Sequence, residues 1–273
     1  MSMITGRQMV DGLRGLREAA PASLTPRVLE ATGMDGIDRY AEMTGPIWPL
    51  LVAWGPTGIT AIERADDPGS FEDDYVTRFG RRARREDAVP EPLTRTVLRS
   101  IAGERLPDLQ VDLRGLPDFQ QQVLAKTMEI PYGEVRSYAW VANEIGHPRA
   151  QRAVGTALAR NPIPFVIPCH RVVRSDGHIG NYGAGGPDAK REVLLSEGVD
   201  PNELESLANA GVRYIGSDTT NIFCFPTCRN ARRITDQHRV RFRTGDDAEA
   251  LGFRACKVCR PSGVAAVAAV AVA

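Results

Sequence analysis

The sequence predicts a mixed α/β (α+β) chain with a small strand-rich domain, a mostly helical domain with a helix-turn-helix outline, and a small four-cysteine module at the C-terminal end. Two apolar runs, 48–54 and 59–62, flank a Gly/Pro turn, as paired strands do. Helical apolar spacing recurs between 118 and 160. Four of the five cysteines lie near the C-terminal end in two close pairs. A chain of 273 residues has room for these parts, since domains commonly hold about 100–150 residues.

The overall composition sets few limits on the partner of the chain. Its formal net charge is zero, so a nucleic-acid partner cannot be inferred from the charge balance. The N-terminus lacks the charged and apolar pattern of a signal peptide. The Ala/Val-rich run 263–273 is only about half as long as a membrane-spanning helix. We therefore expect a cytoplasmic protein with no membrane association and a flexible tail over 262–273.

The N-terminal segment carries no chemistry that the sequence identifies. Amphipathic spacing at 9–20 and 26–40 predicts a helical extension over 1–44. The strand-rich domain is expected to follow it.

This strand-rich domain is predicted over 45–116, with further helices at 70–85 and 93–103. Residues 81–85 include four arginines, which could form a phosphate-binding patch. A solvated helix face is the simpler interpretation of this cluster.

The domain at 117–198 has a helix-turn-helix outline. A first helix over 118–130 ends at a Pro-Tyr-Gly turn. Ser137 is placed to cap a second helix, and a Gly-His-Pro break separates this helix from a third over 149–160. Helical hairpins are common without DNA, so the pattern alone leaves DNA binding and plain helix packing open.

Cys169 lies in the segment 161–171, which reads Asn-Pro-Ile-Pro-Phe-Val-Ile-Pro-Cys-His-Arg. The apolar run 165–167 between two prolines predicts a short buried extended segment that fixes the thiol in place. A buried structural cysteine is the usual interpretation, but His170 and Arg171 beside it could favour the thiolate. Because adjacent residues of an extended segment point to opposite sides, a relay through water to His170 fits better than direct contact.

This segment resembles the active-site signature of the O6-alkylguanine-DNA alkyltransferases, and the resemblance extends over 117–198. It implies a suicide repair protein that moves an alkyl group from O6-alkylguanine, and also from O4-methylthymine, in double-stranded DNA to Cys169. It further implies a monomer that flips the damaged nucleotide out of the duplex. The alternative is a non-catalytic protein that binds the alkylated lesion or acts as a regulatory DNA-binding protein. Relatives of that kind replace the active-site cysteine, and Cys169 is present.

The resemblance assigns roles to five residues of the catalytic site. Cys169 attacks as the thiolate, and a relay runs from it through water to His170 and Glu197. Tyr138 donates a proton to the departing base or stabilises its charge. Asn161 braces the junction between the third helix and the active-site segment, where a helix C-cap is the alternative.

The resemblance also implies a set of DNA contacts. Arg152 fills the gap that the flipped nucleotide leaves, with its helix in the minor groove. The loop 180–186 closes over the flipped base, and it is one residue longer here than in the usual form of the family. The DNA-contacting residues implied are Arg149, Gln151, Arg152, Arg171 and Tyr182.

The four clustered cysteines have the spacing of a zinc site, Cys224-x3-Cys228 and Cys256-x2-Cys259. In a cytoplasmic chain this spacing favours one Zn²⁺ bound by four thiolates over two disulfides. Cys169 is then left over as the nucleophile. A purely structural zinc finger is the alternative to a reactive site.

The segment 211–261 resembles the zinc domain of the bacterial adaptive-response protein Ada. There the first cysteine is both a zinc ligand and an acceptor of methyl groups from DNA phosphotriesters, so the resemblance implies this second acceptor role for Cys224. The two modules stand in the reverse order to Ada and lack its regulatory region, which leaves a transcriptional role open. The arginines available for phosphates are Arg229, Arg232, Arg233, Arg239 and Arg241.

Overall fold

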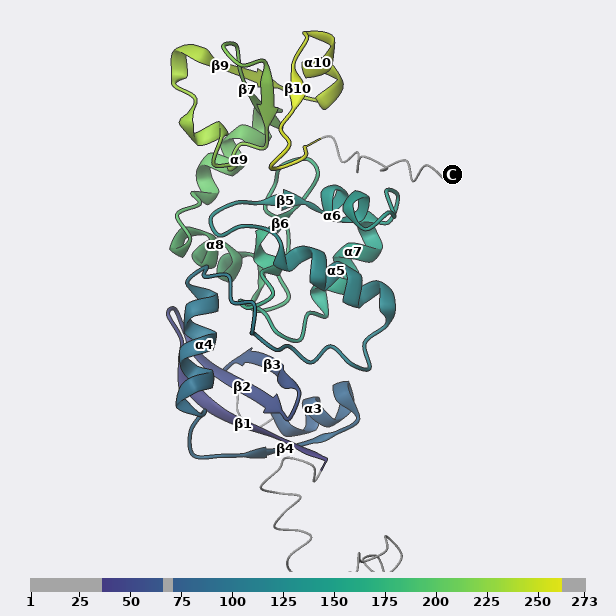
Figure 1. Ribbon diagram of the computed structural model, residues 1–273, viewed down its shortest axis with the longest axis vertical. Coiled ribbons are helices and arrows are strands. Elements are labelled where there is room, and N and C mark those ends of the chain that lie inside the picture. Colours follow the sequence, from purple (N-terminus) through teal and green to yellow (C-terminus); the bar gives the residue numbers. More distant parts are fainter. Residues whose placement is uncertain (1–35, 66–70, 262–273) are drawn as a thin grey trace, which may run out of the picture.

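The computed structural model describes residues 36–65 and 71–261. The strand-rich domain, the helical domain and the four-cysteine module follow one another along the long axis of the molecule (Figure 1). Helices and strands occur in every part, so the α/β (α+β) prediction is confirmed. Within the described ranges, no helix combines the length and apolar character needed to cross a bilayer.

The N-terminal domain is a four-stranded sheet with two helices. Its elements are β1 (Ile37–Thr44), β2 (Pro49–Gly55), β3 (Gly58–Arg64), α3 (Phe71–Phe79), β4 (Arg82–Arg85) and α4 (Glu91–Ile101). The strand order is β3-β2-β1-β4, with β4 parallel to β1 and the other pairs antiparallel. Because side chains alternate along a strand, Leu51 and Ala53 of β2 pack with α3, whereas Leu50 and Val52 join the main core.

The helix expected over 26–40 is wrong at its C-terminal end. Residues 37–40 belong to β1, where Tyr40 pairs with Ala53 of β2. The buried positions of β1 fill both faces of the sheet, and this packing outweighs the helical spacing. The strand-rich domain therefore begins inside the predicted 1–44 extension, and the rest of that extension, up to residue 35, lies outside the described residues.

The helix expected over 70–85 is also too long. It ends at Phe79, and Gly80 follows with a left-handed φ of 65°, a conformation that stops a helix. The arginine cluster then runs into β4 at the edge of the sheet instead of lining a helix.

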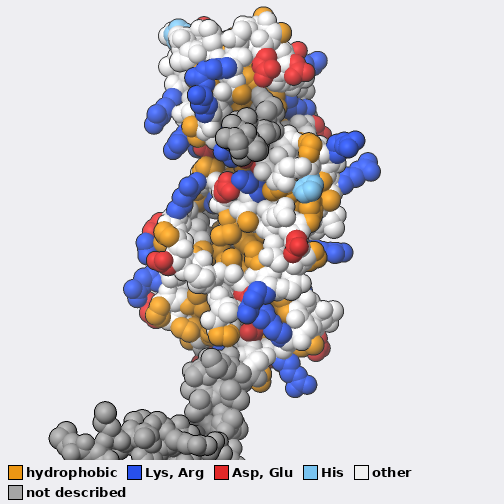
Figure 2. Space-filling model, turned by 45° about the vertical axis from the view of Figure 1, so that its right-hand side comes forward, with side chains coloured by type: hydrophobic (Ala, Val, Ile, Leu, Met, Phe, Trp, Pro, Cys, Tyr) orange, Lys and Arg blue, Asp and Glu red, His pale blue; other side chains and the backbone are white. Residues whose placement is uncertain are grey.

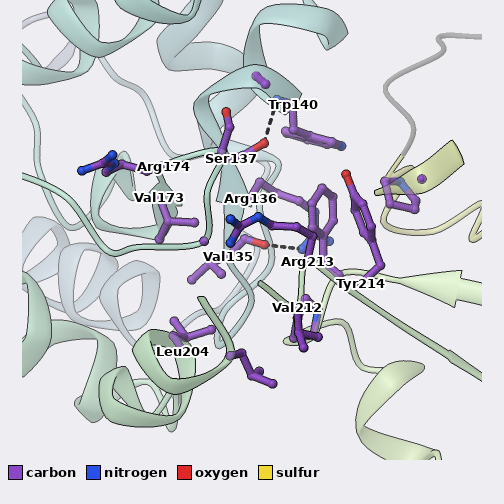
Figure 3. A pocket seen from close by; sticks show the side chains of 18 of the residues that line it. Val135, Arg136, Ser137, Trp140, Val173, Arg174, Leu204, Val212, Arg213 and Tyr214 are labelled. Atoms are coloured by element: carbon purple, nitrogen blue, oxygen red, sulfur yellow. Dashed lines mark hydrogen bonds between the residues drawn. The ribbon is translucent and has the colours of Figure 1, made fainter. Parts of the chain in front are cut away.

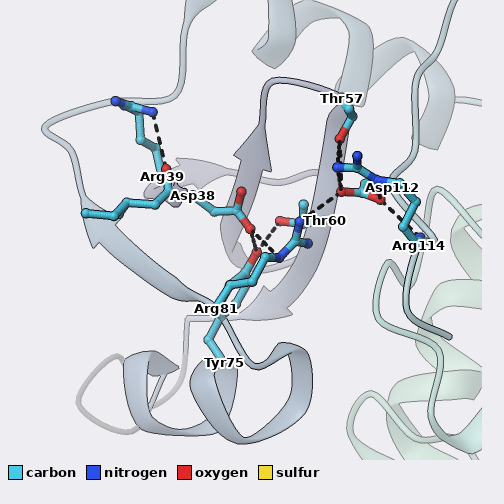
Figure 4. A network of polar contacts seen from close by, with 9 residues as sticks. Asp38, Arg39, Thr57, Thr60, Tyr75, Arg81, Asp112 and Arg114 are labelled. Atoms are coloured by element: carbon cyan, nitrogen blue, oxygen red, sulfur yellow. Dashed lines mark hydrogen bonds and ion pairs between the residues drawn. The ribbon is translucent and has the colours of Figure 1, made fainter. Parts of the chain in front are cut away.

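Arg81, the first arginine of this cluster, belongs to a polar network inside the domain (Figure 4). It pairs with Asp38 of β1 and with Asp112, each at 3.2 Å. The Tyr75 hydroxyl of α3 donates to the same Asp38 at 2.5 Å and lies 2.6 Å from the Thr60 hydroxyl. The network therefore ties the sheet to α3 and to the chain that leads into the next domain, and it occupies Arg81.

The helical domain has three packed helices before the cysteine turn and one after it. Its elements are α5 (Asp118–Met128), β5 (Arg136–Ser137), α6 (Tyr138–Glu144), α7 (Gln151–Ala159), the 3-10 helix η1 (Cys169–Arg171), β6 (Val172–Val173) and α8 (Gly186–Ser196). The predicted cap is present, because Ser137 Oγ accepts a hydrogen bond from the Trp140 amide at 3.1 Å. Parallel pairing of β5 with β6 places the start of α6 beside the end of η1. The first helix, the capped second helix and the third helix are confirmed in outline.

The C-terminal module is a second four-stranded sheet with short helices. Its elements are α9 (Pro201–Asn209), β7 (Tyr214–Ser217), β8 (Ile222–Cys224), η2 (Ala231–Arg233), η3 (Asp236–His238), β9 (Arg239–Phe242), α10 (Gly245–Ala250) and β10 (Arg254–Ala255). The strand order is β10-β8-β7-β9. All four cysteines of the module are buried in the same apolar cluster as the core of the helical domain, so the two parts pack as one body.

Candidate active site and metal centre

Cys169 opens the 3-10 helix η1, and its thiol is buried. Asn161, just after α7, donates its side-chain amide to Cys169 Sγ at 3.1 Å and to the Ile167 carbonyl at 2.8 Å. Its Oδ1 accepts the Ile163 amide at 3.0 Å. Asn161 thus joins the end of α7 to the cysteine turn, in the position that the sequence analysis expected.

The segment 165–167 is buried as predicted, but it is not extended. Phe165 has a φ of 70°, and Pro164 bridges to Ile167, so the chain makes a tight turn here. The bonds of Asn161 to both arms of the turn hold this unfavourable backbone in place. The turn delivers Cys169 to the end of α7.

Burial raises the pKa of the Cys169 thiol, while the Asn161 bond and the charge of Lys190 oppose the rise. Lys190 lies on α8 with its ammonium fully inside the protein. It donates to the Val172 carbonyl at 2.6 Å and to the Ile179 carbonyl at 2.8 Å. Burial lowers the pKa of Lys190 to about 8, and Cys169 opposes this shift. Lys190 is therefore a nearby buried cation that stabilises a thiolate at Cys169.

His170 and Glu197 form a buried pair next to the thiol. His170 Nε2 lies 2.7 Å from Glu197 Oε1, and the second ring nitrogen, Nδ1, has no hydrogen-bond partner among the described residues. Burial lowers the pKa of His170 against the opposing effect of Glu197. Burial alone would raise the pKa of Glu197, but His170 and then Arg171 lower it to about 2. The resting pair is a neutral imidazole and a carboxylate.

A pocket of about 310 Å³ opens onto Cys169. Asn161, Arg64 of β3 and the loop 183–185 are among its lining residues, so the loop expected to close over a base does border the cavity. Tyr182 is buried beside it, with its ring in edge contact with His170 at 6.2 Å.

Tyr138 is the first residue of α6 and lies near Cys169. Burial raises the pKa of its hydroxyl, and the nearby Cys169 adds to that rise. Its ring lies beside Gly155 of α7, where an added Cβ would meet the ring at 3.9 Å. The tyrosine therefore stays protonated and keeps a proton to donate.

The predicted DNA-contacting residues of the third helix lie apart from this cluster. Arg149, Gln151 and Arg152 are exposed at the N-terminal end of α7, whereas Val154 and Leu158 on its other face are buried. The helix thus presents a basic end to solvent while its C-terminal end leads through Asn161 to Cys169.

The four cysteines of the C-terminal module form a metal site. Their sulfur atoms all lie within 4.8 Å of one another, and tetrahedral Zn²⁺ with Zn–S near 2.3 Å requires about 3.8 Å between sulfurs. Four thiolates in a buried cluster are typical of structural zinc. Basic side chains gather on the outer surface of the module, at the upper end of Figure 2. The exposed arginines of this part are Arg229, Arg232, Arg233, Arg241, Arg243 and Arg254.

Comparison with known proteins identifies the family. A model of the DNA-binding domain of 6-O-methylguanine DNA methyltransferase matches residues 118–199, and one of the metal-binding domain of Ada matches 207–262. The methylated-DNA–protein-cysteine methyltransferase of Methanosarcina barkeri is 38% identical over 166 residues, which are 58% of this chain and 96% of that protein. This chain belongs to the methylated-DNA–protein-cysteine methyltransferase family.

Other members of the family match a smaller share of their length. The Rattus norvegicus protein is 39% identical over 48% of this chain and 66% of its own length, and the Mycobacterium bovis protein is 51% identical over 33% and 53%. The chain thus covers between half and two thirds of these relatives. A crystal structure of Mycobacterium tuberculosis OGT in complex with DNA is 32% identical over 61% of this chain and 98% of that one, with a TM-score of 0.48.

Arg171, which the resemblance implies as a DNA contact, takes part in an internal network in this structure. Arg171 is buried and does not face solvent, as a DNA contact would. Its Nε and Nη2 donate to Glu197 at 2.8 Å, and its Nη1 donates to the Ile130 carbonyl at 2.7 Å. A buried carboxylate needs a paired cation, and Arg171 supplies it.

Lys190 is the residue of this methyltransferase site that the sequence analysis missed. The only sequence sign was a lysine in line with the apolar positions Val193 and Leu194 of α8. The ammonium group of a lysine at such a position must either reach the surface or lie among buried hydrogen-bond acceptors. The tertiary structure decides which of the two occurs.

Proposed function

We propose that this chain is a suicide DNA repair protein that transfers the methyl group of O6-methylguanine in double-stranded DNA to Cys169. Family membership supports the reaction class. The observation that carries the proposal for this chain is the Cys169 thiol, held by the Asn161 amide at the wall of a pocket, with the buried His170–Glu197 pair starting at the next residue of the chain. Alkylated guanine and O4-methylthymine are both substrates under this proposal, and the protein acts as a cytoplasmic monomer.

The site can first generate the nucleophile. The carboxylate of Glu197 accepts a hydrogen bond from the Nε2–H of His170. This bond fixes the tautomer in which Nδ1 is unprotonated and can act as the base. A proton leaving Cys169 reaches Nδ1 through a water, and Glu197 stabilises the imidazolium that forms. The thiolate is stabilised by the Asn161 amide and by the charge of Lys190.

The transfer is a displacement at the methyl carbon. The Cys169 sulfur forms a bond to carbon as the bond from carbon to guanine O6 breaks, and the electron pair stays on the base. Tyr138 gives its hydroxyl proton to that base, and the proton held on His170 returns through water to the tyrosine oxygen, so that both side chains end neutral. The product thioether carries no charge and cannot act again, so each molecule repairs one lesion.

The proposal is tested by titrating a duplex that carries one O6-methylguanine with the protein. Lesion loss should stop at one equivalent per protein molecule. A lesion-binding protein of the alternative class would bind the same duplex and leave every lesion in place.

Arg152→Ala should slow repair of the duplex by on the order of a hundredfold, because the side chain replaces the flipped nucleotide and flipping costs a few kcal/mol. Transfer from the free base O6-methylguanine should be nearly unchanged. The comparison of the two single-turnover rates checks this. Equal slowing with both substrates would reject the role assigned to Arg152.

We further propose that Cys224 accepts a methyl group from a DNA methylphosphotriester. The match to the metal-binding domain of Ada supports this, and so does a pocket of about 450 Å³ that Cys224 lines together with Arg233 and His238. When bound, zinc keeps the four cysteines as thiolates at neutral pH. The Cys224 sulfur attacks the methyl carbon and the phosphate leaves as an ordinary diester anion, with Arg233 beside it.

Methylation of Cys224 should strengthen DNA binding. Four thiolates around Zn²⁺ carry a net charge of about minus two, and conversion of one to a thioether makes the site about one unit less negative. Attraction of the nearby arginines for phosphates should rise, and the gain should shrink as salt is added. The measurement is DNA affinity at two salt concentrations before and after Cys169→Ala protein is exposed to methylphosphotriester DNA. If zinc stays bound and no methyl reaches Cys224, the site is structural.

A further inference from the structure

The segment 133–138 lies between the active site and the zinc module. At one end, the Gly133 amide donates to Glu197 Oε2 at 3.1 Å. At the other end, Ser137 caps α6 and Tyr138 opens it. The segment therefore carries both the backbone that holds the relay carboxylate and the proton-donating tyrosine of the proposed reaction.

Residues flanking the zinc ligand Cys228 hold this segment at three consecutive positions. The Arg232 guanidinium donates to the Gly133 carbonyl. The Arg229 amide donates to the Glu134 carboxylate at 3.1 Å. Thr227 Oγ1 accepts the Val135 amide at 2.9 Å. These three contacts come from one short segment of the zinc module, residues 227–232, which runs into η2.

A second zinc ligand holds the start of α6. The Trp140 indole donates to the Cys259 carbonyl at 3.0 Å, and Arg260 next to it pairs with Glu144 at the end of the helix, at 2.9 Å. Both ends of α6 are thus fixed by residues 259–260.

The rest of the seam between the modules combines apolar packing with a cavity, since buried residues of both parts, such as Trp140 and Phe225, belong to one core cluster. A pocket of about 270 Å³ separates Val135, Arg136 and Trp140 from Val212 and Tyr214 of the zinc module (Figure 3). The hydrogen bonds from the two cysteine turns add directional contacts to this packing.

We propose that the zinc module is a positioning element of the guanine-lesion site, with Arg232 as its main positioning residue. Arg232 holds Gly133, Gly133 holds Glu197, and Glu197 orients His170. The same contacts fix the backbone that leads into α6 and hence the position of Tyr138. This inference rests on the proposed alkyl transfer and adds to it that the transfer depends on a module that contributes no described residue to the lining of the Cys169 pocket.

Gly133 is suited to this link. It has a φ of 70°, and an added Cβ would lie 3.0 Å from the Glu197 carbonyl and 3.6 Å from Arg232. The positive φ favours glycine here, and an added Cβ would crowd the Glu197 carbonyl.

The test uses the zinc-loaded full chain and measures the methyl-transfer rate constant at saturating O6-methylguanine duplex. Arg232→Ala should lower this constant roughly five- to tenfold, as loss of one ordinary hydrogen bond would. Arg232→Lys, which keeps a cationic donor, should restore most of the rate. Thr227→Val leaves the charge unchanged and should slow transfer as well. Arg254→Ala, which removes an exposed arginine of the same module, should leave the rate unchanged.

Deuterium uptake at the amides of 133–138 is the second readout. It should rise in Arg232→Ala and Thr227→Val and stay unchanged in Arg254→Ala. If both variants match the control in rate and uptake, the inference is overturned. If the unaltered chain transfers no methyl at all, the proposed function fails, and the deuterium uptake alone decides the positioning.

Discussion

The Cys169→Ala variant is expected to transfer no methyl group from O6-methylguanine and to keep its affinity for the duplex. The attacking sulfur is gone, and no other cysteine is among the described residues that line the pocket. Binding should persist because the exposed Arg149 and Arg152, at the N-terminal end of α7, are untouched. The measurement is single-turnover lesion loss together with a DNA titration.

Cys169→Ser is the matched control for the thiol. It keeps a group of similar shape that can accept the Asn161 hydrogen bond, yet a serine hydroxyl is a far poorer nucleophile than a thiolate. Both variants should remain folded and should fail in transfer. Normal lesion loss in either variant would mean that another residue accepts the methyl group.

The Glu197→Ala variant is expected to lose about 3–5 kcal/mol of unfolding free energy, because removal of one partner leaves a buried charge uncompensated. The guanidinium of Arg171 would stay buried with only the Ile130 carbonyl as an acceptor among the described residues, and His170 would lose the group that fixes its tautomer. Denaturant unfolding measures the stability, and single-turnover transfer measures the loss of the base.

Glu205→Ala is the control for this variant, since Glu205 also pairs with a histidine, His178, but near the surface. A half-buried pair of this kind is partly screened by solvent, so its loss should cost less, about 1 kcal/mol. Similar losses in the two variants would show that the buried pair has no special part in stability.

The same carboxylate sets a pH dependence. The pKa of Glu197 in the folded state, about 2, lies below its ordinary value of 4.5. A lowered folded pKa means that its stabilising contribution is fully present above the ordinary value and is lost as pH falls toward 2. The difference in stability between the unaltered chain and Glu197→Ala should therefore narrow in acid.

The sequence predicted those elements whose local signals agree with their packing. The strands around the Gly/Pro turn, the helix capped by Ser137 and the four-cysteine cluster all have strong short-range patterns, and each is present. In these places propensity, turn residues and tertiary contacts favour one structure.

The features that the sequence could not predict depend on contacts between residues that are far apart in the chain. Nothing in the arginine-rich stretch of β4 signals a strand, and it forms one because the edge of β1 offers free backbone groups. The positive φ of Phe165 depends on the two bonds that Asn161 makes across the turn. Arg171 and Arg232 look like phosphate contacts in the sequence, and each is bound to an acceptor inside the protein. An arginine pattern shows charge but not the acceptor that the charge will find.

The central claim is that Cys169 is the acceptor of the guanine methyl group. The most direct measurement is peptide mass spectrometry of the chain after incubation with a duplex that contains a single O6-methylguanine and no phosphotriester. We predict one added methyl group per molecule, on the peptide that carries Cys169 and on no other cysteine. A methyl group on Cys224 or any other residue, or loss of the lesion with no methyl group on the protein, would contradict the account.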